Sequence, residues 1–256
     1  MDLQLKGKTA VVTGGTRGIG LAIAECFADE GANVAICARN ADQVAEVVKA
    51  LQGRGVRAWG QAVDIADGPA LKSFVTQAGA ELGGVDILVS NASALVQGNA
   101  ESDWQAMFEI DVLGAVRTFE AVKPLLLESA AAKGDAVFLM ISSVSAAQSD
   151  TPSSYGAMKS ALIHFAKGIA RANAPKGLRC NVISPGTVFF EGGSWGNVKA
   201  NNPTFFETMI KRNPTGRMAT PQEIANAAVF LASPVSSYTT GVNLIVDGAL
   251  SNRVNF

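Results

Sequence analysis

Short apolar runs alternate with longer segments of helical periodicity along the whole chain. The short runs are rich in Val, Ile and Ala, which is typical of strands that are buried on both faces of a sheet. We predict strands at Thr9–Thr13, Asn33–Ala38, Arg57–Val63, Val85–Ser90, Ala136–Ser142, Arg179–Ser184 and Val242–Val246. The segments between them repeat apolar residues every three to four positions, roughly, and predict helices that include Gly18–Glu30, Ala41–Leu51, Pro69–Leu82, Ser102–Glu128 and Ser153–Asn173. Strands joined by helices form right-handed parallel crossovers, so the pattern predicts an α/β fold: a doubly wound parallel sheet of about seven strands with helices on both faces.

A single domain is expected because no linker, repeat or change of composition divides residues 1–256. Only the stretch Gly186–Arg217 breaks the rhythm, with glycines, prolines and aromatic residues in a polar setting. Long irregular segments in compact domains are commonly functional, so we predict a substrate lid at about residues 187–216. Within it, Asn202 and Pro203 have the cap-and-proline signature of a helix start. Local packing against the body or a neighbouring subunit is the alternative explanation of its aromatic residues.

Composition narrows the class of partner. Apolar residues make up 48% of the 256 residues and charged residues 17%, which is enough for a large core. A formal net charge of −1, with no run of Lys or Arg, argues against a nucleic-acid partner. No apolar run reaches the ~18 residues of a membrane span, and the N-terminus does not resemble a signal peptide. We therefore expect a cytoplasmic protein with a small-molecule substrate and no membrane partner.

Cysteine and histidine are too sparse to indicate a metal site. Cys26, Cys37 and Cys180 are far apart, odd in number and surrounded by apolar residues, so we predict reduced thiols in the core. The chain has one histidine, His164, which lies in an apolar helical segment. A structural role for this histidine is expected rather than a catalytic one. We predict no bound metal.

A glycine-rich turn follows the first predicted strand. Its glycines permit a tight turn and a close approach of backbone to a pyrophosphate, while the following helix offers N–H groups and a partial positive charge to the anion. The spacing is G-x-x-x-G-x-G, and an ordinary tight turn is the alternative reading of the glycines by themselves. We predict that dinucleotide phosphates bind at Gly14, Thr16, Arg17, Gly18, Ile19 and Gly20.

The end of the second predicted strand indicates which dinucleotide binds. NAD-binding folds usually place an acidic residue there to hold the adenosine ribose, but this strand is followed by Arg39 and Asn40. Arg39 and Arg17 instead offer two planar guanidinium groups, which suit a 2′-phosphate because they donate paired hydrogen bonds. We therefore predict NADP(H) as the cofactor, with two solvated surface arginines as the alternative.

Two further pairs of residues follow strands and are expected in the same crevice. Asp64, with its neighbour Ile65, follows the third strand and is placed to accept a hydrogen bond from the adenine amine. Asn91 and Ala92 follow the fourth strand. Each pair also suits an ordinary turn, so neither identifies a cofactor site without the glycine-rich turn.

Tyr155 and Lys159 are four residues apart on a predicted helix, so their side chains share one face. A nearby ammonium group favours the phenolate form of tyrosine, which makes the hydroxyl able to exchange a proton with a carbinol oxygen. Ser142 and Ser143 end the preceding strand, and a hydroxyl there can polarise a substrate carbonyl. By itself, a Y-x-x-x-K pair is common on helix surfaces. Here the pair follows two serines at a strand end and precedes Pro185 and Gly186, and this order favours an active-site pair over a surface pair.

Taken together, these motifs resemble the classical branch of the short-chain dehydrogenase/reductase family, in the family's order and over nearly the whole chain. The resemblance rests on Thr13–Gly20, Asn91 and Ala92, Ser143, Tyr155 and Lys159, Pro185 and Gly186, and Val246–Gly248. It implies a seven-stranded Rossmann-type sheet, hydride transfer on a nicotinamide, and commonly a homotetramer, with a homodimer as the smaller assembly. Among family members, 3-oxoacyl-(acyl-carrier-protein) reductases are the most similar in kind.

The resemblance also implies residue roles. Ser143, before Val144, matches the family's catalytic serine, but the segment from it to Tyr155 is one residue short, so Ser142 stays an alternative. Pro185, Gly186 and Val188 match positions that flank the nicotinamide.

Three positions depart from the family's pattern. Ser93 stands where the family usually has glycine, and Phe190 where many members have a threonine that contacts the cofactor's carboxamide. Asp111 stands where the family has an asparagine whose backbone carbonyl helps to order a water next to the lysine. Asp111 can keep that backbone role, but a nearby carboxylate would oppose phenolate formation at Tyr155.

The sequence therefore predicts an NADP(H)-dependent oxidoreductase that reduces a ketone or oxoacyl group, or oxidises a secondary alcohol. The alternative is an NADP(H)-binding regulator or scaffold with little turnover, which Asp111 and Ser93 favour and the intact set of Ser143, Tyr155 and Lys159 opposes. The residues do not identify the substrate.

Overall fold

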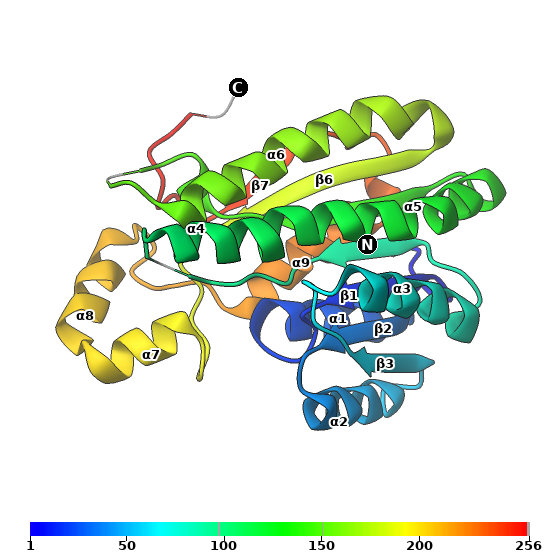
Figure 1. The fold of residues 1–256 in the computed structure, drawn as a ribbon, viewed down its shortest axis with the longest axis horizontal. Helices are drawn as coiled ribbons and strands as arrows, with labels where there is room; N and C mark the ends of the chain where they lie inside the picture. The colour runs from blue at the N-terminus through cyan, green and yellow to red at the C-terminus, as the bar shows by residue number, and fades with distance from the viewer. Residues whose placement is uncertain (97, 150, 255–256) are drawn as a thin grey trace.

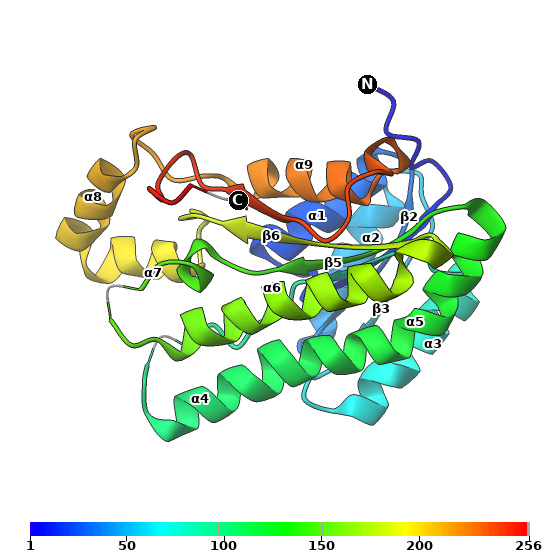
Figure 2. The same ribbon diagram turned by 90° about the horizontal axis from the view of Figure 1, so that it is seen from above.

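The computed structural model describes residues 1–96, 98–149 and 151–254, and a seven-stranded parallel sheet runs through this part of the chain (Figures 1 and 2). Its strand order is β3-β2-β1-β4-β5-β6-β7. The strands are β1 (Thr9–Thr13), β2 (Asn33–Ala38), β3 (Ala58–Ala62), β4 (Ile87–Ser90), β5 (Ala136–Ile141), β6 (Leu178–Pro185) and β7 (Asn243–Val246). The predicted fold class is confirmed, and the predicted strands differ from those observed only at their ends.

Helices cover both faces of the sheet (Figure 2). One face packs against α1 (Gly18–Asp29), α2 (Ala41–Gln52) and α9 (Pro221–Ala232). The opposite face packs against α3 (Gly68–Leu82), α5 (Gly114–Lys133) and α6 (Ser154–Asn173). The core thus has two apolar layers, one on either side of the central strands β1, β2, β4, β5 and β6, which are almost fully buried, as the continuous apolar runs predict.

The helix predicted at Ser102–Glu128 differs in detail from the one observed. It begins as α4 (Glu101–Met107), so Ser102 is inside the helix and does not cap it. It then passes through a wide π-helical turn, η1 (Phe108–Leu113), and continues as α5 to Lys133, where Gly134 adopts a left-handed conformation with φ of 81°. The helical repeat cannot reveal the π turn, because apolar spacing stays nearly the same when one residue is added to a turn.

The segment predicted as an irregular lid contains two helices, α7 (Ser194–Asn201) and α8 (Pro203–Arg212). The predicted start of α8 is confirmed: the Asn202 side chain accepts a hydrogen bond from Phe205 N at 3.1 Å, and Pro203 is the first helical residue. The sequence analysis did not foresee α7, whose glycine-rich start hides its periodicity. In both views these two helices lie at one end of the molecule, beyond the arrowhead of β6.

The strand order reverses at β1 and β4, because the chain leaves β3 at one edge and returns to the other side of β1. In open parallel sheets, such a switch point leaves a crevice at the carboxyl ends of the strands, where ligands bind. Apart from Asp111 on η1, the residues that the sequence predicts as functional follow a strand or lie in the first turns of a helix at this end.

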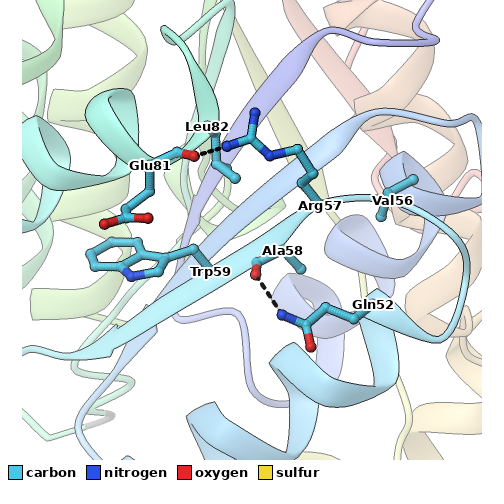
Figure 3. A pocket seen from close by; sticks show the side chains of 7 residues that line it. All are labelled: Gln52, Val56, Arg57, Ala58, Trp59, Glu81 and Leu82. Carbon is cyan, nitrogen blue, oxygen red and sulfur yellow. Dashed lines mark hydrogen bonds between the residues drawn. The ribbon is translucent and has the colours of Figure 1, made fainter.

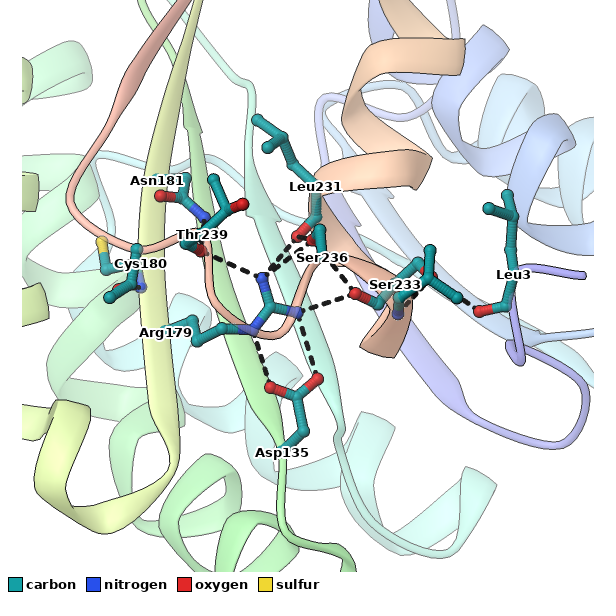
Figure 4. Close-up of polar contacts among 11 residues, drawn as sticks. Leu3, Asp135, Arg179, Cys180, Asn181, Leu231, Ser233, Ser236 and Thr239 are labelled. Atoms are coloured by element: carbon teal, nitrogen blue, oxygen red, sulfur yellow. Dashed lines mark hydrogen bonds and ion pairs between the residues drawn. The ribbon is translucent and has the colours of Figure 1, made fainter. Parts of the chain in front are cut away.

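A buried arginine fastens the opposite end of the sheet (Figure 4). Arg179, at the start of β6, makes a paired ion contact with Asp135 and donates to the carbonyl oxygens of Leu231, in the last turn of α9, and of Ser233, which follows that helix. Ser233 in turn donates to Leu3 O at 2.7 Å, which ties down the N-terminal segment. The sheet is therefore cross-linked by charge-assisted hydrogen bonds at the end opposite the predicted site residues.

The cysteines form no disulfide with one another. Cys37 and Cys180 are buried as predicted, whereas Cys26 is half exposed on α1. Burial raises the pKa of the Cys37 thiol to about 12, so it stays protonated at neutral pH. Within the described ranges, no helix has the length and apolar character needed to cross a membrane.

Candidate active site

The glycine-rich turn between β1 and α1 has a shape that side chains do not allow. Gly14 and Gly18 have φ values of 67° and 55°, in the left-handed region. A Cβ on Gly20 would lie 2.2 Å from Gly14 O and 2.4 Å from Asn91 Nδ2. All three glycines are therefore required for the turn to close against the end of β4.

Asn91 holds this turn in place. Its Nδ2 donates to Thr13 O at 3.0 Å and to Gly14 O at 3.1 Å. The Thr13 hydroxyl accepts from Asn91 N at 3.0 Å and from Ala92 N at 3.2 Å. The sequence analysis placed Asn91 and Ala92 beside the cofactor; the structure shows that the Asn91 amide is used to fasten the turn to the next strand.

The two arginines predicted to select the cofactor follow the neighbouring strands β1 and β2, on the same side of the switch point. Arg17 is the N-cap of α1 and Arg39 follows β2, and both are exposed. Within the described residues, neither guanidinium is paired with a carboxylate. Both are thus available for an anionic ligand near the turn.

Asp64 can offer its side chain to a ligand, whereas Ile65 can offer only its backbone. Asp64 is exposed after β3, and one carboxylate oxygen accepts from Ala66 N at 3.0 Å, which leaves the other oxygen available. Ile65 is only 8% exposed and packs against Gly114, where a Cβ would lie 2.5 Å from its Cγ2. The Ile65 side chain therefore belongs to the core, so only its backbone can face a ligand.

Thr16 and Ile19 complete the turn with half-buried side chains. Next to them lies the ring of Phe190, one of the three departures from the family's pattern. A Cβ on Gly18 would lie 2.5 Å from Phe190 Cζ, and a Cβ on Gly193 would lie 2.6 Å from the same ring. Phe190 thus packs between the glycine-rich turn and the residue that precedes α7.

Tyr155 and Lys159 lie on the first turns of α6. Ser153 caps this helix, as predicted, and its hydroxyl accepts from Gly156 N at 3.0 Å. Tyr155 is half exposed, and its hydroxyl makes no hydrogen bond with the described residues. Lys159 is 2% exposed; its Nζ donates to Ile141 O at 3.0 Å and lies 5.7 Å from the centre of the Tyr155 ring. The phenol is open to a ligand while the ammonium behind it is fixed.

Asp111 lies directly against this lysine. Its Oδ1 is 2.9 Å from Lys159 Nζ, and both side chains are almost wholly buried. Its Oδ2 accepts from Ala94 N at 2.9 Å. The contact with Lys159 is ionic rather than a well-aligned hydrogen bond, because Oδ1 accepts none of ordinary geometry. The π turn at η1 carries Asp111 into this position.

The structure distinguishes the two candidate serines. The Ser142 hydroxyl is buried and donates to Lys159 O at 2.9 Å. Ser143 Oγ accepts from Ser145 N at 3.1 Å and donates to no described residue. A hydroxyl has a single proton to donate, so Ser143 retains its donor for a ligand and Ser142 does not. This geometry favours Ser143, as the resemblance implies.

The residues after β6 line the same end of the sheet. Gly186 N donates to Val246 O at 3.0 Å, and a Cβ on Gly186 would lie 2.9 Å from Asp247 Cα. Val188 is 9% exposed and pairs with Ala219 through a backbone bridge. Pro185 and Gly186 thus present backbone to the crevice, whereas the Val188 side chain is mostly covered.

The aromatic residues of α7 and α8 pack on one another. Trp195 stacks on Phe205 with ring centres 6.1 Å apart, and Phe189 meets Phe206 edge-on at 5.6 Å. Lys199 lies over the Phe189 ring, 5.0 Å from its centre. These contacts join α7 and α8 into one unit, and they lie within the predicted lid segment itself.

Two cavities are found in the described part of the chain. One of about 430 Å³ lies at the amino-terminal end of β3, between Arg57, Trp59 and Glu81 (Figure 3). The other, of about 380 Å³, lies next to the predicted site, between Trp104, the segment Ser145–Ser149 and the first turns of α6 at Gly156 and Ser160. Neither is lined by Ser143, Tyr155 or Lys159. No cluster of metal-ligating side chains occurs among the residues that the structure describes.

Comparison with known proteins places the whole constellation in one family. The family model described as enoyl-(acyl carrier protein) reductase matches residues 14–251. Isoepoxydon dehydrogenase of Penicillium expansum is 36% identical over 257 residues, which cover 98% of this chain and 98% of that protein. A 3-oxoacyl-(acyl-carrier-protein) reductase of Chlamydia pneumoniae is 32% identical over 255 residues, which cover 98% of this chain and 100% of that protein.

Solved structures of similar fold indicate the same family. L-Sorbose reductase from Gluconobacter frateurii, complexed with NADPH and L-sorbose, superposes with a TM-score of 0.89 at 32% identity, covering 99% of this chain and 100% of that chain. A short-chain type dehydrogenase/reductase from Mycobacterium marinum has a TM-score of 0.86 at 28% identity, covering 98% of each chain. Matches of this extent, together with the strand order and the Tyr155–Lys159 pair, show that the chain is an oxidoreductase of the short-chain dehydrogenase/reductase family.

Proposed function

We propose that this protein is an NADP(H)-dependent oxidoreductase that reduces a ketone or oxoacyl group to a secondary alcohol, or catalyses the reverse reaction. The observation that carries the proposal is that the half-exposed Tyr155, whose hydroxyl has no partner among the described residues, has its ring centre 5.7 Å from the buried ammonium of Lys159. An uncommitted phenol backed by a fixed cation at the mouth of a dinucleotide crevice suits proton transfer to or from a substrate oxygen.

The residues present fit NADP(H). A Cβ on Gly20 would strike Gly14 O, so the turn keeps a glycine-walled cradle at the start of α1 that suits a pyrophosphate. Arg17 and Arg39 supply two exposed guanidinium groups without carboxylate partners in the described chain, which supports a 2′-phosphate on the adenosine ribose. The NADPH complex of L-sorbose reductase is consistent with this choice.

Further residues are assigned to the cofactor by position. Gly14, Thr16, Gly18 and Ile19 would hold the phosphates, Asp64 and the Ile65 backbone the adenine, and Ala92, Pro185, Gly186 and Val188 the nicotinamide side of the crevice. Asn91 contributes by fixing the turn. Lys159 Nζ has three N–H donors. One is given to Ile141 O and Asp111 Oδ1 lies beside the ammonium as an ionic contact, which leaves a donor for a ribose hydroxyl.

A bound nicotinamide would supply or accept the hydride. Tyr155 would give its hydroxyl proton to the carbonyl oxygen in reduction and take it back in oxidation, within hydrogen-bond reach of that oxygen. Ser143 would donate to the same oxygen and orient the carbonyl, which Ser142 cannot do while its proton is bound to Lys159 O. Lys159 stabilises the phenolate that forms, because its charge is fixed nearby in a site from which water is largely excluded.

The lid and the assembly complete the proposal. We infer that residues 1–256 act as one cofactor-binding domain and that α7 and α8 move together over a carbonyl substrate, since their aromatic residues pack on each other. A homotetramer or homodimer would cover β7, the half-buried edge strand.

The proposal is tested by titrating the protein with NADPH and with NADH and then following nicotinamide absorbance with a panel of ketones and acetoacetyl thioesters. We expect tighter binding of NADPH, and turnover of at least one carbonyl. Replacing Arg17 and Arg39 by Ala should weaken NADPH binding by about tenfold or more, because each substitution removes a charge-assisted hydrogen bond to the 2′-phosphate. NADH has no 2′-phosphate, so its binding should be nearly unchanged.

Two results would overturn parts of this proposal. Tight NADPH binding without turnover of any carbonyl in the panel would favour the regulator or scaffold. Equal loss of NADPH and NADH affinity in the arginine variants would refute their role in cofactor choice.

A further inference from the structure

We infer that Asp111 acts through Lys159 to keep Tyr155 in its phenol form, and that this suits the site to the reductive direction. The inference rests on the proposed function only for its consequence for direction. Its physical content, the effect of one buried carboxylate on the ionisation of one tyrosine, can be measured without turnover.

Asp111 and Lys159 form a buried ion pair behind the ring of Tyr155. Asp111 Oδ1 and Lys159 Nζ are 2.9 Å apart, and the two side chains are 0% and 3% exposed. Both charges are therefore removed from solvent, where screening is weak and an ion pair acts on its neighbours as a nearly neutral unit. The ring of the half-exposed Tyr155 lies 5.7 Å from the same Nζ. The carboxylate thus cancels much of the positive field that a lone ammonium would exert on the phenol.

The carboxylate itself is held in place. Asp111 Oδ2 accepts from Ala94 N at 2.9 Å, and the π turn places its backbone next to the chain after β4. One carboxylate oxygen is thus held by a backbone N–H and the other lies against the lysine ammonium. An asparagine at this position would keep the shape and one acceptor while removing the charge.

Other charged groups do not take over this role. On the same π turn, Glu109 points outward and pairs with Arg117 of α5. On α4, Asp103 is bound to the backbone N–H of Ala100 and Glu101 is exposed. The neighbouring β5 and the short helix after Ser143 contain no titratable side chain, and on β6 the charged residue is Arg179, which is paired with Asp135 at the far end of the strand.

Further along α6, the titratable groups His164, Lys167 and Arg171 are exposed and lie at least one turn beyond Lys159. Within the described residues, Asp111 is therefore the one carboxylate in contact with the Lys159 ammonium.

The consequence for catalysis follows from which form of tyrosine each direction needs. Reduction needs the phenol, which gives a proton to the carbonyl oxygen, and oxidation needs the phenolate, which removes one from the alcohol. A weaker positive field leaves phenol as the main form up to a higher pH. No residue of an enzyme alters the equilibrium constant of the reaction it catalyses. The effect of Asp111 is therefore expected in the pH range over which each direction proceeds.

The composition of the chain makes a direct measurement possible. It contains two tyrosines, Tyr155 and Tyr238, and the latter is fully exposed. Tyr238→Phe therefore leaves Tyr155 as the sole source of tyrosinate absorbance in the near ultraviolet. In that background we would titrate the parent, Asp111→Asn and Glu109→Gln, with circular dichroism at each pH to restrict the titration to folded protein.

Glu109→Gln is the matched control, because it removes a carboxylate from the same π turn on its outward side. We expect tyrosinate to appear at lower pH in Asp111→Asn than in the parent, with several-fold more phenolate at a given pH, and Glu109→Gln to follow the parent. The acid limb of the saturated oxidation rate should shift to lower pH in Asp111→Asn in the same way.

Coincident tyrosinate curves for Asp111→Asn and its parent would overturn the inference, as would an equal shift in Glu109→Gln. The tyrosinate titration and the turnover assay test the inference and the proposed function separately. A shifted tyrosinate curve without turnover would support the coupling and refute the enzyme, whereas turnover with an unshifted curve would do the reverse.

Discussion

Ser142 and Ser143 are adjacent, yet their hydroxyl groups have different tasks. The Ser142 proton is bound to Lys159 O, which joins the end of β5 to the catalytic helix, and Ser143 keeps its proton for a ligand. The sequence predicted both residues as candidates and could not choose between them, because the choice depends on which way each side chain turns at the strand end. The sequence likewise could not show that the Asn91 amide, predicted to line the cofactor crevice, fastens the glycine-rich turn.

This division of tasks predicts opposite phenotypes for two alanine variants. Ser143→Ala should lower the turnover rate by roughly two to three orders of magnitude, because the carbonyl loses a donor in a site with little water. Ser142→Ala should keep most of the turnover and lower the free energy of unfolding by about 1 kcal/mol, the worth of one buried hydrogen bond. Steady-state rates and urea unfolding of both variants check this; the reverse assignment of the two losses would show that Ser142 is the catalytic serine.

At the scale of secondary structure, the alternation of apolar runs and helical segments predicted the strands to within two residues or so of their observed ends. The glycine-rich turn was predictable as well, because its glycines follow β1 directly and its close contacts admit no side chain. The π turn at Phe108–Leu113 and the helix α7 were not predictable. The first depends on a hydrogen-bond shift that the residue pattern does not record, and the second on packing between Trp195 and Phe205.

Two helical glycines, Gly20 of α1 and Gly168 of α6, should respond differently to replacement by alanine. A methyl group on Gly20 would lie 2.2 Å from Gly14 O, so Gly20→Ala should abolish NADPH binding by pushing the turn away from β4. On an exposed position of α6, a methyl group added to Gly168 would meet nothing within 4 Å. Gly168→Ala should bind NADPH normally and raise the free energy of unfolding by about 0.5–1 kcal/mol. Fluorescence titration and urea unfolding measure both effects, and retained NADPH binding in Gly20→Ala would contradict the proposed phosphate site.

At the scale of the whole molecule, the strand order gathers the residues that follow the six strands β1 to β6 at one end of the sheet. The switch point between β1 and β4 places the glycine-rich turn next to Asn91, and the addition of β5 and β6 brings Ser143 and Pro185 to the same end. The family resemblance implied this arrangement, and the comparisons confirm the family. The direct contact of Asp111 with Lys159 and the packing of Phe190 on Gly18 needed the structure, because side chains that replace a family's usual residues find new partners.

The central claim is that Tyr155 transfers the proton while the crevice around it binds NADP(H). Its most direct test is to measure NADPH binding and NADPH consumption in the same preparations of the parent and Tyr155→Phe, with a carbonyl that the parent accepts. The account predicts unchanged NADPH affinity, because Phe keeps the ring and loses only the hydroxyl, and a rate of consumption lower by roughly two to four orders of magnitude. A variant that binds NADPH as the parent does and consumes it at the parent's rate would contradict the claim.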